Sequence, residues 1–115
     1  MTKGKVVLVP FPFDDLSATK VRPAVCLTET IGAHRHIVLA FITSRVPADL
    51  LASDLILNAA DADFTLTGLR VTSTLRLHRL MTATVALLRR ELGELSPYLQ
   101  SVVSDKLRQL FALDL

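Results

Sequence analysis

Short apolar runs separated by turn-forming residues constrain the fold of this chain most. Each run is apolar or alternates apolar with polar side chains, which predicts a strand. The predicted strands cover residues 6–9, 21–28, 36–43, 55–57 and 69–80. A turn over residues 30–35 would allow the second and third strands to pair as a hairpin. Because no long strand–helix–strand unit connects the runs, a parallel sheet is not expected.

Proline, glycine and polar residues predict where these strands stop. Pro10 and Pro12 are expected to prevent regular pairing after the first strand, because proline lacks the backbone N–H of a strand ladder. Residues 14–20 are polar and predict a loop. A second loop is predicted over residues 58–67, ending at Gly68.

Two helices are predicted near the C-terminal end. The first covers residues 82–92, with Gly93 as its stop. The second begins with Ser96 as N-cap and Pro97 at the first helical position, and runs to about Leu113. Its apolar stripe consists of Leu99, Val103, Leu107, Leu110 and Phe111. Strands followed by a terminal helix favour a mainly β fold with α: a small, strongly bent barrel carrying the helix, in a single domain over residues 1–115.

Composition indicates a partner surface. Half of the 115 residues are apolar and the mean hydropathy is +0.44, yet no apolar run approaches the roughly 20 residues of a membrane span. We interpret the excess as a dimer or partner interface. The single Cys26 excludes an internal disulfide or a cysteine-based zinc site, and is expected to be a buried small hydrophobe. With no secretory signal pattern, a cytoplasmic location is expected.

The charges are unevenly distributed, although the net charge is only +2. Residues 46–63 contain four aspartates and no base, whereas residues 64–90 contain five arginines and no acid. These are Arg70, Arg76, Arg79, Arg89 and Arg90. Arginine suits bidentate contacts with phosphate, so the basic stretch is compatible with nucleic acid binding. A solvated strand face is the alternative.

Two predicted strands carry polar residues at their ends, and strand formation does not require these residues. Arg22 stands before Pro23, and Thr43 and Ser44 close the strand over residues 36–43. If the fold places them close together, a guanidinium and two hydroxyls would bind a phosphate. The alternatives are a surface arginine before proline and an ordinary turn, since Ser and Thr favour turns.

The order of motifs resembles a known family. It comprises residues 4–27, which read GKVVLVPFPFDDLSATKVRPAVCL, then Ile-Thr-Ser over 42–44, Gly-Leu at 68–69, and Leu-Gly-Glu-Leu-Ser over 92–96. In this order the motifs resemble the MazF/PemK toxins of bacterial type II toxin–antitoxin systems. The resemblance implies a homodimer of SH3-like barrels of the CcdB, Kid and MazF type. It also implies a metal-independent, sequence-specific endoribonuclease for single-stranded RNA, without a cofactor, inhibited by a cognate antitoxin.

The resemblance also implies roles for individual residues. Arg22 and Thr43 would be catalytic, with Ser44 in support and Ser17 as a weaker candidate. Further candidate substrate contacts are Phe13, Lys20, Arg70, Arg76 and His78. Phe13 would stack on a base or, alternatively, pack in the core or a dimer. RNA supplies the 2′-OH nucleophile itself, so attack on the adjacent phosphate to give a 2′,3′-cyclic phosphate and a 5′-OH needs no metal.

Some positions depart from the family pattern. Lys5 replaces an acidic residue, His78 stands where many members carry an acid, and residues 81–84 read Met-Thr-Ala-Thr in place of Arg-Thr-Ile-Asp. These departures leave two alternatives open: a gyrase-targeting toxin of the same fold family, and a decayed module that binds RNA or antitoxin without cleavage. His34 and His36 share a predicted strand face without a third ligand, so no metal site is expected. For His78, a proton carrier and a structural histidine are both open.

Overall fold

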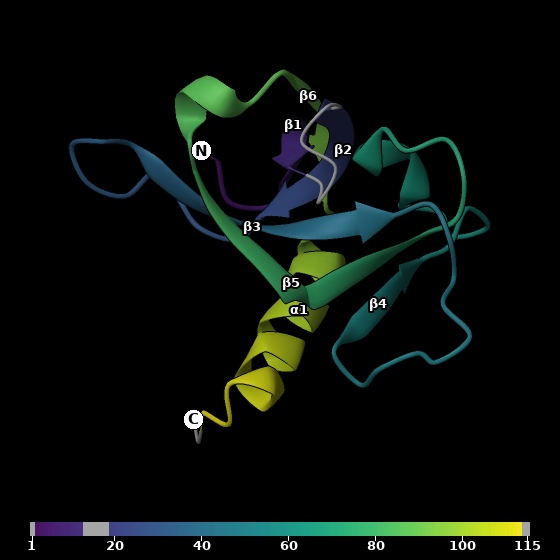
Figure 1. Ribbon diagram of the computed structural model, residues 1–115. Coiled ribbons are helices and arrows are strands. Elements are labelled where there is room, and N and C mark those ends of the chain that lie inside the picture. The colour runs from purple at the N-terminus through teal and green to yellow at the C-terminus, as the bar shows by residue number, and fades with distance from the viewer. Residues whose placement is uncertain (1, 13–18, 114–115) are drawn as a thin grey trace.

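A computed structural model describes residues 2–12 and 19–113 of the chain (Figure 1). Its strands are β1 (Lys5–Pro12), β2 (Thr19–Cys26), β3 (His36–Thr43), β4 (Asp54–Leu57), β5 (Ser73–Thr84) and β6 (Arg90–Glu94). The helices are the 3₁₀ turns η1 (Phe64–Thr67) and η2 (Val85–Leu87), and the α-helix α1 (Pro97–Leu110). The strands pair antiparallel in the order β4-β5-β3-β2-β1-β6. This curled sheet with one C-terminal α-helix confirms the predicted fold class.

The sheet curls because β5 bends sharply in its middle. Ala40 of β3 lies opposite Leu80, whereas the next residue, Phe41, lies opposite Arg76. Residues 77–79 are therefore extra on the β5 side, and such irregularities bend a strand. Figure 1 shows the bend clearly in the green ribbon. The half of β5 before the bend pairs with β4 and the end of β3, and the other half pairs with the start of β3.

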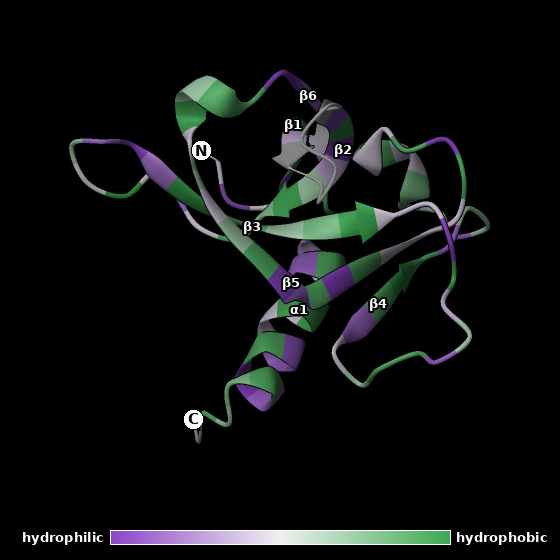
Figure 2. Cartoon of the chain, in the orientation of Figure 1, coloured by the Kyte–Doolittle hydropathy of each residue, from purple (hydrophilic) through white to green (hydrophobic). Residues whose placement is uncertain are grey.

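Each face of the sheet carries its own apolar cluster. The helix-side cluster contains Val6, Val25, Ala40, Ile42, Leu57, Phe64, Leu75, Leu77, Leu95, Leu99 and Val103. The opposite cluster contains Val7, Val9, Ala24, Cys26, Ile37, Leu39, Phe41 and Ala83. Successive residues of a strand point to opposite faces, which is why neighbours such as Val6 and Val7 enter different clusters. Figure 2 shows the resulting concentration of hydrophobic residues in the strands.

The prediction that Pro10 and Pro12 prevent regular pairing is wrong. β1 continues through both, with Pro10 opposite Val21 and Pro12 opposite Thr19 of β2. On its other side β1 pairs with β6 only as far as Leu8. Beyond that point β1 is an edge strand, where a missing N–H toward the open side is tolerated. β2 consequently begins at Thr19, so Lys20 lies in a strand and not in the predicted loop.

The predicted helix over residues 82–92 is also wrong. β5 continues to Thr84, a single 3₁₀ turn follows, and β6 begins at Arg90. Pairing with β3 and β1 overrides the local helical pattern, since non-local contacts commonly outweigh helix propensity. Gly93 is a strand residue and not a helix stop: a Cβ there would lie 2.1 Å from the Leu66 carbonyl oxygen. Glycine is thus required where β6 passes η1.

The start of α1 is confirmed. The Ser96 hydroxyl accepts a hydrogen bond from the Leu99 N–H (3.1 Å) and donates one to Asp63 (2.6 Å), with Pro97 in the first turn. The helix ends at Leu110 and not near residue 113. Phe111 is 54% exposed, so the predicted apolar stripe is buried only in its first part. Within residues 2–12 and 19–113, no helix has the length and apolarity needed to cross a membrane.

Candidate active site

The pairing of β2 with β3 determines the sheet face from which Arg22 and Thr43 project. Ala24 lies opposite Phe41, and Cys26 lies opposite Leu39. The β2–β3 pairing ends at Ala24 and Phe41. Arg22 and Thr43 each lie two residues beyond this last pair, and therefore on the same face as their strand neighbours Ala24 and Phe41. Residues opposite each other in an antiparallel pair project from the same face of the sheet. Arg22 is exposed and Thr43 half-buried, so the two candidate residues share one accessible end of that face.

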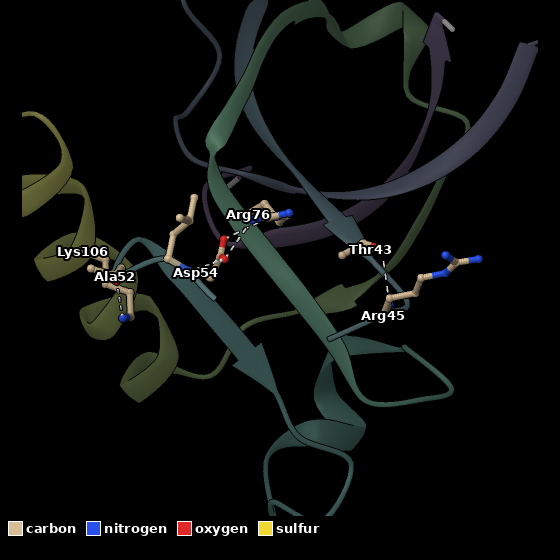
Figure 3. A network of polar contacts seen from close by, with 7 residues as sticks. Thr43, Arg45, Ala52, Asp54, Arg76 and Lys106 are labelled. Carbon is tan, nitrogen blue, oxygen red and sulfur yellow. Dashed lines mark hydrogen bonds and ion pairs between the residues drawn. The ribbon is translucent and has the colours of Figure 1, made fainter. Parts of the chain in front are cut away.

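Thr43 forms a hydrogen bond within a local turn and pairs with β5. Its hydroxyl oxygen accepts a hydrogen bond from the Arg45 N–H at 3.3 Å (Figure 3), and Ser44 is exposed beside it. The turn alternative therefore describes the local backbone correctly. A threonine hydroxyl still has its own hydrogen to donate and a second lone pair. Thr43 can thus keep this turn and bind a further group.

Thr74 of β5 lies directly opposite Thr43. It is fully buried, and within the described part of the chain its hydroxyl has no hydrogen-bond partner. Buried polar groups are usually paired, so this one is unusual. Sequence analysis did not single out Thr74, because its position beside Thr43 depends on the pairing of β3 with β5.

Arg76 is fixed by a buried carboxylate. Its Nε and Nη2 each donate to one oxygen of Asp54 at 3.1 Å, and the Leu51 N–H donates to the same carboxylate at 2.9 Å (Figure 3). The Asp54 side chain is 0% exposed. Arg76 lies opposite both Phe41 and Asp54, so the pair occupies the same sheet face as Thr43. The opposite charge signs of residues 46–63 and 64–90 were the one sequence signal for this contact.

Of the remaining candidate RNA contacts, only Lys20 lies on the same strand as Arg22 among the described residues. Lys20 is exposed on β2, two residues from Arg22 and therefore on the same face. Arg70, before β5, and His78, in the bend of β5, are exposed. In the described ranges neither forms a hydrogen bond or ion pair with Arg22 or Thr43. Ser17 and Phe13 lie outside the described residues.

Cys26, His34 and His36 show no sign of a reactive or metal-binding role in the described residues. Burial, with smaller contributions from the charges of Glu91 and Glu29, raises the pKa of the Cys26 thiol to about 11; the thiol is neutral and buried, as predicted. The rings of His34 and His36 stack with centroids 5.8 Å apart. No group of three potential metal ligands forms among residues 2–12 and 19–113.

Lys5, which departs from the family pattern, has acidic partners in β6. Its Nζ lies 3.5 Å from the Glu91 carboxylate and 3.8 Å from that of Glu94. A basic residue at this position therefore complements the adjacent strand, and the substitution does not touch Arg22 or Thr43.

Comparison with known proteins identifies the fold and the family. Residues 2–111 match the profile described as PemK-like, MazF-like toxin of type II toxin–antitoxin system. A MazE–MazF complex from Deinococcus radiodurans superposes with a TM-score of 0.75 at 19% identity, covering 99% of this chain and 97% of that one. No curated protein matches the chain.

Two further solved structures have the same fold. A mycobacterial endoribonuclease in complex with its cognate antitoxin gives a TM-score of 0.70 at 14% identity, over 100% of this chain and 98% of that one. The Mycobacterium tuberculosis toxin MazF-mt6 gives 0.67 at 22% identity, over 95% and 99%. At these identities the likeness concerns the fold, and it confirms the predicted MazF-type barrel with a terminal helix.

Proposed function

The chain belongs to the PemK-like, MazF-like toxins of type II toxin–antitoxin systems, and from this premise we propose that it is a metal-independent endoribonuclease acting on single-stranded RNA. The observation that supports the proposal is the pairing of β2 with β3, because Arg22 and Thr43 project from one sheet face, each two residues beyond the Ala24–Phe41 pair. A cation and a hydroxyl on the same face are the groups that a reacting phosphate requires. One similar fold is itself described as an endoribonuclease bound to its cognate antitoxin.

The proposed reaction uses the nucleophile of the substrate. The 2′-OH attacks the adjacent phosphorus, a P–O2′ bond forms, and the P–O5′ bond breaks. The products are a 2′,3′-cyclic phosphate and a 5′-OH. The protein must orient the 2′-OH and stabilise the charge that builds on the non-bridging oxygens. The requirement for a 2′-OH also restricts the reaction to RNA.

Arg22 and Thr43 divide this work in the proposal. Arg22 faces the non-bridging oxygens, where one preorganised donor contributes about 2.7–4 kcal/mol. Thr43 donates its free hydroxyl hydrogen to the same phosphate, with Ser44 in support. Neither Arg22 nor the two hydroxyls are suited to accept the proton of the 2′-OH, because a guanidinium only donates hydrogen bonds and hydroxyls are weak bases. General acid–base help, worth about 10²–10⁴-fold, must come from another group, for which exposed His78 is a candidate.

We also propose that the toxin is a cytoplasmic homodimer inhibited by a cognate antitoxin. One similar structure is described as an endoribonuclease in complex with its cognate antitoxin, and another contains MazF together with MazE. Several large apolar side chains are about half exposed, which supports coverage by protein partners. They include Val46, Leu50, Leu66, Val71, Leu87 and Phe111, and Tyr98 is exposed further, at 70%. Lys20, Ser17, Phe13, Arg70 and Arg76 remain candidate contacts for the RNA on either side of the scissile phosphate.

Cleavage of single-stranded RNA by purified protein in excess EDTA tests the proposal. We expect products with 2′,3′-cyclic phosphate and 5′-OH ends, identified by mass spectrometry. Arg22→Ala and Thr43→Val are expected to lower the rate by about 10²–10³-fold and to abolish growth arrest on expression, without loss of folded protein. Arg108→Ala, at an exposed site on α1, is the control and should cleave normally.

Three results would contradict this assignment. Wild-type rates in both site variants would remove Arg22 and Thr43 from the mechanism. Loss of cleavage in EDTA would refute metal independence. Growth arrest without any RNA cleavage would instead favour the gyrase-targeting alternative, and RNA or antitoxin binding with neither effect would favour a decayed module.

A further inference from the structure

A cleft of about 340 Å³ lies away from Arg22 and Thr43, where the starts of β1 and β3 meet the segment between β5 and β6. Its apolar lining residues are Val7, Ile37, Val85 and Leu88. Its polar lining residues are Thr2, Lys5, Arg35, Arg89, Arg90 and Glu91. We refer to it as the basic cleft, because four of these side chains are basic and one is acidic.

The charges of the basic cleft are only partly neutralised within the protein. Lys5 is paired with Glu91 and, outside the cleft, with Glu94. Arg35, Arg89 and Arg90 are exposed, and none of them has a side-chain hydrogen bond or ion pair in the part of the chain that the structure describes. A concave surface lined by charges of one sign focuses its field and attracts counterions. The three guanidinium groups therefore favour an anionic ligand.

The backbone that carries these arginines is fixed. The Val85 N–H donates to the Arg35 carbonyl at 3.0 Å, and the Arg89 N–H donates to the Leu8 carbonyl at 2.8 Å. Arg35 also has a positive φ of 56°, a conformation that glycine or asparagine adopts more readily. The turn therefore does not explain why arginine stands at this position, whereas a charged ligand in the cleft would.

The cleft and the candidate active site use the same face of the sheet. Val7 and Ile37 belong to the apolar cluster opposite α1, as does Phe41, two residues from Thr43 on that face. Ile37 and Thr43 are six residues apart on β3, roughly 20 Å at about 3.3 Å per residue. The two sites are thus separate positions on one side of the molecule.

We propose that the basic cleft is a second phosphate-binding subsite, which holds the RNA strand at a distance from the cleavage position; this inference rests on the proposed function. RNA carries a phosphate at every nucleotide, so a strand engaged at Arg22 and Thr43 continues to present anions beyond that site. Guanidinium groups bind phosphate oxygens in a bidentate manner. Among the described residues, the lining contains no aromatic ring for base stacking, so we expect the subsite to bind the backbone independently of sequence.

Binding of single-stranded RNA at varied salt tests the subsite. The probes are a long 2′-O-methyl RNA that spans both sites and a short one that spans only one, with affinity measured by fluorescence anisotropy. In the triple variant Arg35→Ala, Arg89→Ala, Arg90→Ala, we expect the slope of log K against log salt for the long RNA to become shallower by about 2, since each lost phosphate contact in a single strand contributes about 0.7.

Matched controls separate this effect from general loss of charge or fold. Arg108→Ala removes one charge at an exposed site on α1 and should leave the slope unchanged, whereas Arg89→Ala alone should make it shallower by about 0.7. The triple variant should bind the short RNA and cleave a short substrate as the wild type does, because Arg22 and Thr43 are intact. Its melting temperature should also be unchanged, since the three side chains are exposed.

The outcomes distinguish the cleft from the proposed function. Wild-type protein that neither binds nor cleaves RNA would overturn both. Wild-type protein that does both, beside a triple variant with the same slope and affinity for the long RNA, would overturn only the subsite. A third outcome is that poly-L-glutamate binds the wild type and loses affinity in the triple variant, while the affinity for RNA is the same in both proteins. The cleft would then be a site for an acidic protein segment, and the RNA subsite would be refuted.

Discussion

The Asp54–Arg76 ion pair allows the most direct quantitative test of this structure. The Asp54 carboxylate is fully buried and accepts three hydrogen bonds, two from Arg76 and one from the Leu51 N–H. Arg76 is itself 20% exposed at its side chain. The pair joins β4 to β5 at the end of the sheet that carries Thr43. Asp54→Asn keeps the shape of the side chain but removes its charge.

The expected cost follows from what remains in the protein after the substitution. A buried pair that loses one partner typically costs about 3–5 kcal/mol, because the other charge stays buried without compensation. Partial exposure of Arg76 lets its guanidinium reach water, so we expect the lower end, about 3 kcal/mol. That is a large part of a typical stability of about 5–15 kcal/mol. It corresponds to a fall in melting temperature of roughly 10 °C or more for a chain of this size.

Urea unfolding followed by circular dichroism measures this cost. The control is Asp105→Asn, which breaks the exposed Arg108–Asp105 pair; that pair is shorter, at 2.7 Å, but exposed pairs contribute only about 0–1 kcal/mol. A loss below about 1 kcal/mol for Asp54→Asn, or one equal to that of the control, would refute the reasoning from burial. The double variant Asp54→Leu, Arg76→Met should recover much of the stability, since replacing both partners by apolar residues removes the uncompensated charge.

Three further outcomes are expected. Thr74→Val should leave stability unchanged or raise it by about 1 kcal/mol in urea unfolding, because the buried hydroxyl has no partner in the described residues and its burial is unfavourable; a loss of that size would indicate a hydrogen bond. Gly68→Ala should destabilise far more than Gly32→Ala: both glycines have φ near +72°, but a Cβ at Gly68 would lie 2.1 Å from the Leu92 carbonyl oxygen, whereas nothing lies within 4 Å at Gly32. Equal melting temperatures for the two variants would contradict the contact. Finally, the pKa of the Cys26 thiol is raised from 9.0 to about 11 in the fold. The stability contributed by the neutral thiol is therefore fully present below pH 9 and is lost as the pH rises toward 11. Cys26→Ala should flatten that decline in urea unfolding at stepped pH, and an unchanged decline would exclude Cys26 as its source.

Local patterns predicted the elements that depend on local interactions. β3 has the predicted bounds, His36–Thr43, because an apolar run of this length, closed by polar residues, is buried on both faces. The start of α1 at Ser96 and Pro97 was predicted because a cap is a contact between residues three apart. These signals are contained in a few neighbouring residues, so a sequence is sufficient to read them.

The errors concern segments whose conformation is set by distant partners. Residues 82–92 have a helix-like pattern, yet β3 and β1 recruit them into strands. Pro10 and Pro12 are compatible with β1 only because β6 stops at Leu8. The contact between Asp54 and Arg76 was not predicted, because the two residues are 22 positions apart in the sequence.

The sequence by itself determined the alternation that builds the strands, the helix cap, and the residue types that suit phosphate chemistry, Arg22 and Thr43 among them. Only the tertiary structure decided which residues meet. The pairing of β2 with β3 leaves Arg22 and Thr43 on one sheet face, and the fold brings Arg35, Arg89 and Arg90 to the lining of one cleft. The physical reason is that side-chain periodicity is local, whereas register and the burial of charge depend on pairing between segments far apart in the chain.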